Sequence, residues 1–136
     1  MNLFLLFQVG MGGALGAISR MLISNYINRN FSLTFPIGIL TVNILGSFII
    51  GLIMGGMYLK VNSGDIKFLP FLITGFLGGF TTFSSFSLET LYLFQEGRVT
   101  QAISYVALTM IGCLIGVYIG AVCGSLWLWL FVVVAV

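Results

Sequence analysis

Four long apolar stretches alternate with short polar connections along the chain. The apolar stretches cover residues 3–27, 37–59, 68–94 and 100–125, and the last stays apolar to Val136. A hydrocarbon core about 30 Å thick is crossed by a helix of about 20 apolar residues, so each stretch is long enough. We therefore predict a single domain, residues 1–136, of four transmembrane helices. The polar connections are 28–34, 60–67 and 95–99.

The composition supports this all-α membrane class. The chain holds 5 Lys and Arg and 3 Asp and Glu among 136 residues, and 60% of its residues are hydrophobic. A soluble domain typically carries about 25% charged residues, so lipid must cover most of this surface. No basic residue precedes the first stretch and no clear cleavage motif follows it, so we interpret it as a span and not as a signal peptide. The expected location is the cell membrane, as a multi-pass protein.

The same composition excludes several functions. A net charge of +2 is too small to indicate nucleic-acid binding. The chain has no histidine, so the commonest general base and metal ligand are missing, and no nucleophile–base pair can be assembled for an enzyme. Cys113 and Cys123 lie in an apolar run, where we expect burial in the bilayer rather than a disulfide or a zinc site.

Glycines recur at helical spacing in the fourth stretch. Gly112, Gly116, Gly120 and Gly124 follow one another every four residues, so a helix presents them on one flat face. Close backbone approach drives helices together in lipid. The face serves either packing within the chain or contact with a second subunit. One four-helix chain is thin for enclosing a pathway, so we expect some glycine faces to meet a second subunit.

The third stretch contains a dense cluster of glycine and hydroxyl residues. A regular lipid-facing helix has no use for such a cluster, and each glycine costs a helix about 1 kcal/mol relative to alanine. Broken backbone at this depth is tolerated only inside protein or beside a water-filled cavity. We predict a break near Gly78–Thr82, whose freed carbonyls bind a cation; the alternative is a continuous helix softened by small residues. The cluster is Gly75, Gly78, Gly79, Thr81, Thr82, Ser84 and Ser85.

Three segments together resemble the Fluc (CrcB) family of small fluoride channels. They are residues 12–20 (GGALGAISR), residues 41–48 (TVNILGSF) with Gly51, and residues 75–89 (GFLGGFTTFSSFSLE). The third segment is the most specific, and Phe80 departs mildly from the aliphatic residue that the family often has. The resemblance implies four transmembrane helices per subunit with a break in the third. It also implies an antiparallel dual-topology dimer, formed by two copies or with a related sister subunit, and two pores that export fluoride passively to relieve its toxicity.

Asn43, Phe83 and Phe86 are the leading candidates for an anion pore. Fluoride is strongly hydrated, so its ligands must replace water, and the Asn43 amide can donate N–H bonds; its alternative role is an interhelical hydrogen bond. Phe83 and Phe86 share one helix face, and phenyl ring edges carry partial positive charge. The resemblance implies that this pair lines the pores. Hydroxyl donors nearby are Thr82, Ser84 and Ser85.

A second polar face is expected on the fourth helix. Tyr105, Thr109 and Cys113 recur every four residues, and similar positions form a polar track in the family. Cys113 is the least secure member because a thiol is a weak donor. Thr109 has an alternative, a hydrogen bond to its own helix backbone.

Two charged residues have open assignments. Arg20 either attracts anions at a vestibule or extends to the membrane interface. Glu89 follows Phe86 by three residues, and it either pairs with Arg20 or lies beside the anion path; the sequence does not choose.

The resemblance also implies a structural sodium ion at the dimer centre. The backbone carbonyls of Gly78 and Thr81 are the expected ligands, repeated from the second subunit. The Thr81 side chain is not one of the expected ligands.

Other functions compete with a channel. A small proton-coupled multidrug transporter also has four spans, but proton coupling needs an ionisable group deep in the membrane, and Glu89 is the only candidate. A structural subunit without transport has no use for the polar cluster in the third span.

The basic residues barely specify an orientation. Lys60 and Lys67 lie on one side of the predicted membrane, and Arg29, Arg98 and, if it reaches the interface, Arg20 lie on the other. Excess Lys and Arg normally mark the cytoplasmic side. A nearly balanced chain is therefore expected to insert in both orientations, as an antiparallel homodimer requires.

Overall fold

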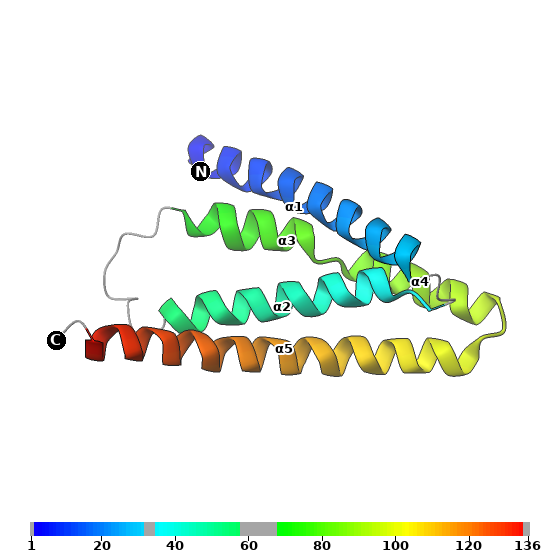
Figure 1. The fold of residues 1–136 in the computed structure, drawn as a ribbon. Helices are drawn as coiled ribbons and strands as arrows, with labels where there is room; N and C mark the ends of the chain where they lie inside the picture. Colours follow the sequence, from blue (N-terminus) through cyan, green and yellow to red (C-terminus); the bar gives the residue numbers. More distant parts are fainter. Residues whose placement is uncertain (1, 32–34, 58–67, 135–136) are drawn as a thin grey trace.

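The computed structural model describes residues 2–31, 35–57 and 68–134, without the side chains of 128–134. The part of the chain it describes is all helical (Figure 1). Four segments of it are long and apolar enough to cross a membrane, as predicted. The elements are α1 (Leu3–Asn30), α2 (Ile37–Met57), η1 (Pro70–Leu77), α3 (Gly78–Phe80), α4 (Phe83–Gln95) and α5 (Val99–Val134).

The predicted boundaries need small corrections. The first helix runs to Asn30, three residues beyond the predicted end, so the polar residues Asn28 and Asn30 belong to the helix. The last helix begins at Val99 and continues unbroken to Val134, a length of 36 residues, which exceeds what one span requires. The predicted end of the second span at Leu59 and the connection 60–67 lie outside the described residues.

Hydrogen bonds at the helix ends explain where several elements begin. The Asn2 side chain accepts from Phe4 N at 3.1 Å and so caps α1. The Asn28 Oδ1 accepts from Gly38 N at 2.9 Å and thereby ties the end of α1 to the first turn of α2. Between α4 and α5 the chain reverses through Gly97, whose φ of 73° is readily adopted by glycine.

The helices form two closely packed pairs. In Figure 1, α2 runs along α5, and α1 lies against η1 and α3. A Cβ at Gly120 or Gly124 would collide with backbone carbonyls of α2, and a Cβ at Gly51 or Gly55 would collide with those of α5. Gly116 likewise meets the α2 backbone and Gly112 meets the Ile44 side chain of α2, so packing within the chain accounts for the whole ladder.

The third span is broken, as predicted, but at one end of the predicted segment. Gly78–Phe80 is still helical, and the extended residues are Thr81 (ψ 155°) and Thr82 (φ −153°). A continuous softened helix is therefore wrong. The glycines serve packing: a Cβ on Gly79 would come within 3.0 Å of the Gly13 backbone on α1. The sequence did not indicate the π-helical winding of η1 before the break.

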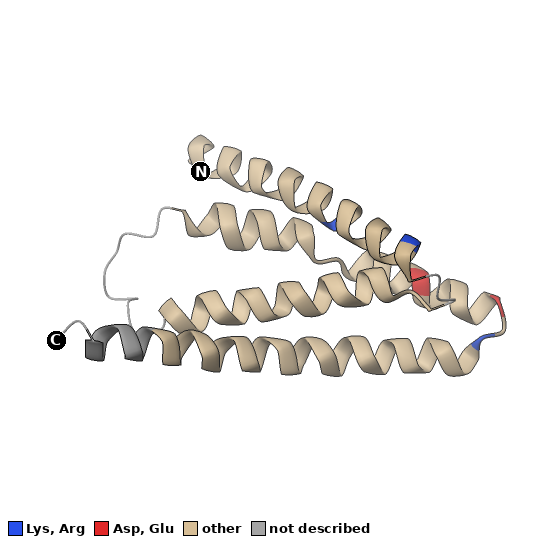
Figure 2. Ribbon diagram, viewed as in Figure 1, with Lys and Arg blue, Asp and Glu red and all other residues tan. Residues whose placement is uncertain are grey.

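A small core lies where α4 meets α2 and α5. It consists of side chains from all three helices, while many large apolar side chains elsewhere are exposed, as expected for a surface in contact with lipid. Figure 2 shows the charged residues of the described chain toward this same end of the bundle. The buried members of the core are Ile39, Phe86, Leu93, Ala102 and Tyr105.

Candidate functional site: a cavity at the helix break

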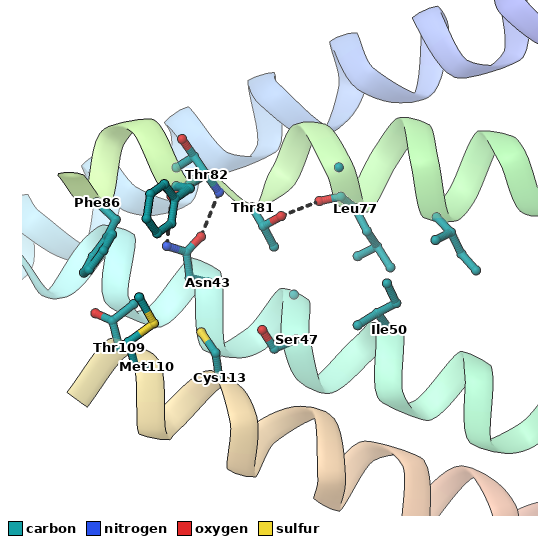
Figure 3. A pocket seen from close by; sticks show the side chains of 14 residues that line it. Asn43, Ser47, Ile50, Leu77, Thr81, Thr82, Phe86, Thr109, Met110 and Cys113 are labelled. Carbon is teal, nitrogen blue, oxygen red and sulfur yellow. Dashed lines mark hydrogen bonds between the residues drawn. The ribbon is translucent and has the colours of Figure 1, made fainter. Parts of the chain in front are cut away.

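A cavity of about 340 Å³, here called the central cavity, lies at the break in the third span (Figure 3). Its walls come from α2, the third span and α5, so residues far apart in the sequence meet there. None of its lining residues is an acid, a lysine or an arginine. They are Asn43, Gly46, Ser47, Ile50, Ile73, Leu77, Gly78, Thr81, Thr82, Phe83, Phe86, Thr109, Met110 and Cys113.

Asn43 is bonded to the backbone at the break. Its Oδ1 accepts from Thr82 N at 2.8 Å, and its Nδ2 donates to Thr82 O at 3.1 Å. The amide thus gives the Thr82 N–H an acceptor in place of the Gly78 carbonyl, and the alternative role as an interhelical bond is confirmed. An amide nitrogen has two donors, and one remains beside the cavity. Both residues are buried, at 7% and 8% exposure.

The break also removes the helical donors of two carbonyls. Thr82 N would bond the Gly78 carbonyl in a continuous helix, but it donates to Asn43. Ser85 N would bond the Thr81 carbonyl, but it donates to Thr82 Oγ1 at 3.2 Å. The Thr81 hydroxyl donates to Leu77 O at 2.9 Å. The backbone oxygens of Gly78 and Thr81 have lost these helical donors, so their lone pairs can serve as cation ligands.

The two phenylalanines both line the central cavity but differ in burial. Their ring centroids are 5.4 Å apart with an interplanar angle of 49°. Phe86 is 5% exposed and packs against Tyr105, while Phe83 is 69% exposed. Phe83 thus stands at the rim of the cavity, on a surface of the chain that nothing in this single subunit covers.

The hydroxyl residues of α4 do not all reach the cavity. Thr82 lines it and caps α4, and its Oγ1 lies 3.1 Å from Ser84 Oγ and 3.2 Å from Ser85 Oγ. Ser84 and Ser85 are not among the lining residues, and their contact with the site is the hydroxyl interaction with Thr82.

The expected polar face of α5 divides between two places. Thr109 and Cys113 line the central cavity, but Tyr105 does not; it is fully buried, and its hydroxyl donates to Glu89 Oε2 at 2.5 Å. The Thr109 hydroxyl is buried without a hydrogen-bond partner in the described structure. The alternative bond from Thr109 to its own helix backbone is therefore absent.

Glu89 and Arg20 do not pair with each other, and neither lines the central cavity. Glu89 binds Tyr105 rather than Arg20. It lines a second cavity of about 290 Å³ at the charged end, together with residues such as Asn28 and Arg98. Arg20 is half-buried on α1 and lines neither cavity.

Several lining residues were not predicted from the sequence, among them Ser47 and Met110. Ser47 stands one helical turn after Asn43 on α2, and this spacing could have identified it. Met110 gave no such signal, because a methionine in an apolar helix is ordinary packing material.

Comparison with known proteins gives consistent matches. The family described as "CrcB-like protein, Camphor Resistance (CrcB)" matches residues 7–121. The fluoride-specific ion channel FluC of Campylobacter fetus is 43% identical over 121 residues, covering 88% of this chain and 93% of the relative. The FluC of Helicobacter acinonychis is 47% identical over 122 residues, covering 88% and 94%. The FluC of Nitratiruptor is 47% identical over 111 residues, covering 82% and 84%.

Proposed function

Since this chain belongs to the CrcB family of FluC fluoride channels, we propose that it conducts fluoride passively out of the cell along the central cavity. The observation that carries this proposal is the Asn43–Thr82 contact. It holds the third span open beside a cavity that offers neutral hydrogen-bond donors and no fixed charge. A proton-coupled transporter would need an acid there, and Glu89 lies in the other cavity.

Neutral donors suit passive conduction of fluoride. An anion that sheds water in the cavity can accept from the remaining Asn43 N–H and from the Thr109 hydroxyl, while the ring edges of Phe86 offer partial positive charge. Without a cationic side chain the ion is not held tightly, and a conducting site must also release its ion. Chloride is larger and accepts hydrogen bonds less strongly, so it gains less from the same donors.

A second subunit in the opposite orientation would complete the pore. The ring of Phe83 supports this arrangement, because one chain leaves it 69% exposed beside the cavity. In an antiparallel pair, a two-fold axis in the membrane plane generates two equivalent pores. A related sister chain could take the place of the second copy.

A sodium ion at the dimer axis fits the residues present. The carbonyls of Gly78 and Thr81 have lost their helical donors to Asn43 and Thr82. Unwound carbonyls inside membrane helices are typical sodium ligands. The partner would contribute an equivalent pair. The ion would offset the cost of the broken helix and would be structural.

Fluoride efflux from liposomes tests the function. Purified protein is reconstituted in vesicles loaded with potassium fluoride or potassium chloride, and efflux is started with a potassium ionophore. We expect rapid loss of fluoride and little loss of chloride. Equal loss of both anions, or fluoride loss that requires a proton gradient, would overturn the proposal.

A further inference from the structure

Two sulfur-containing side chains share one wall of the central cavity. Met110 and Cys113 both line it, and residues three apart on a helix have neighbouring side chains. Figure 3 shows both side chains rising from α5 on the side of Asn43. Neither sulfur has a role in the conduction path argued above. Cys113 is a free, half-buried cysteine.

A third donor atom belongs to the same wall. Thr109 precedes Met110, is 5% exposed, and has a buried hydroxyl oxygen without a hydrogen-bond partner. An oxygen whose lone pairs are free can bind a ligand that enters the cavity. The lining holds no acid and no basic residue, and its other oxygen and nitrogen donors are harder than sulfur, so they compete weakly for a soft ligand.

We propose that Cys113 and Met110 form a binding site for a soft metal ion of the class of Hg²⁺, Ag⁺ and Cu⁺, with Thr109 as a weak third ligand. Thiolate and thioether sulfurs select such ions over sodium or magnesium. The described residues contain no group of three His, Cys, Asp or Glu that could hold a metal ion. The proposed site is of another kind, because one of its ligands is a methionine sulfur. A metal bound there would occupy the space through which fluoride passes, so it would block conduction.

Mercuric chloride is the probe best matched to the site. It is uncharged, so it enters the apolar interior of the membrane at a lower desolvation cost than a bare cation. The Cys113 sulfur forms a bond to mercury, its S–H proton goes to water, and one Hg–Cl bond breaks to release chloride. The Met110 thioether then adds as a neutral donor without any further bond being broken.

Fluoride efflux in the presence of mercuric chloride tests the proposal, with each variant compared with its own untreated flux. The native channel and Cys123→Ser, whose cysteine is exposed away from the cavity, should lose flux about tenfold or more, and Cys113→Ser should resist. Met110→Leu should need about tenfold more mercury for the same block, because one sulfur ligand is gone.

Two results would overturn the site. The first is a block that persists in Cys113→Ser or disappears in Cys123→Ser. The second is an unchanged mercury requirement in Met110→Leu, because mercury would then be reacting with the Cys113 thiol alone. Intact-protein mass spectrometry of a Cys123→Ser channel supplies a readout independent of conduction. A mercury adduct that blocks later alkylation of Cys113 is expected, and its absence contradicts the site even if the chain conducts no fluoride.

Discussion

Asn43 and Thr82 hold each other through two hydrogen bonds, from Thr82 N to Oδ1 at 2.8 Å and from Nδ2 to Thr82 O at 3.1 Å. The contact joins α2 to the third span across 39 residues of sequence. It makes the broken helix a defined structure, because the Thr82 N–H would otherwise be buried without an acceptor.

Replacing Asn43 with aspartate should damage both stability and conduction. A carboxylate cannot donate to Thr82 O, so that carbonyl loses the donor from Asn43 and faces negative charge. The expected loss is about 1–3 kcal/mol of stability, together with nearly all fluoride flux. Thermal unfolding in detergent and liposome efflux measure the two effects.

The matched control for this change is Asn30→Asp. Asn30 donates to Tyr26 O at an exposed position near the end of α1, so losing that bond should cost little. Native flux in Asn43→Asp would refute the role of this amide in the pore.

The two phenylalanines of the cavity should respond differently to isoleucine. Both Phe83→Ile and Phe86→Ile should cut fluoride flux while the dimer stays assembled, because the ring edges are lost. Only Phe86→Ile should lower stability, by about 1 kcal/mol, since Phe86 is buried and Phe83 is 69% exposed. Efflux and gel filtration check flux and assembly. Phe94→Ile, on α4 but away from the cavity, is the control, and full flux in both cavity variants would disprove the assignment.

Thr109→Val should separate stability from function. Valine has the same shape, and removing an unpartnered buried hydroxyl is neutral or slightly stabilising, within about 1 kcal/mol. Fluoride flux should nevertheless fall, because the cavity loses a donor. The exposed Thr100→Val, in the first turn of α5, should change neither quantity. A loss of stability in Thr109→Val would mean that the hydroxyl has a partner in the membrane.

Alanine should have opposite effects at a glycine packed between α2 and α5 and at an open glycine of α1. Gly120→Ala places a Cβ against the Phe48 carbonyl and within 2.9 Å of Leu52 N, so the helices must separate at a cost of about 1–3 kcal/mol. Gly10→Ala meets nothing within 4 Å and should stabilise α1 by up to about 1 kcal/mol. Thermal unfolding of both variants is the measurement, and equal effects would contradict the packing.

The fraction of molecules labelled at one loop position shows whether the chain inserts in both orientations. Ser63, which lies outside the described residues, is replaced by cysteine in a chain without Cys113 and Cys123. An impermeant thiol reagent added to whole cells should label about half of the molecules if insertion is unbiased. Complete labelling or none would mean one fixed orientation, and an antiparallel homodimer could not form.

Much of this protein follows from its sequence because hydropathy and helix breaking are local properties. Apolar length determines the four spans, and the clustered glycines and hydroxyls locate a break within Gly78–Thr82. The lone amide of Asn43 and the pair Phe83 and Phe86 mark the cavity through residue type and spacing, since an amide deep in a span must find a polar partner.

The choice of partners was decided only by the tertiary structure, because it depends on the distance and rotation between helices. From the sequence, Glu89 could pair with Arg20 or lie beside the anion path. The packing of α4 on α5 instead places it where it accepts a hydrogen bond from the Tyr105 hydroxyl. The break lies at Thr81–Thr82 rather than at the glycines, because close contact with α1 keeps Gly79 helical while Asn43 on α2 takes the backbone groups of Thr82.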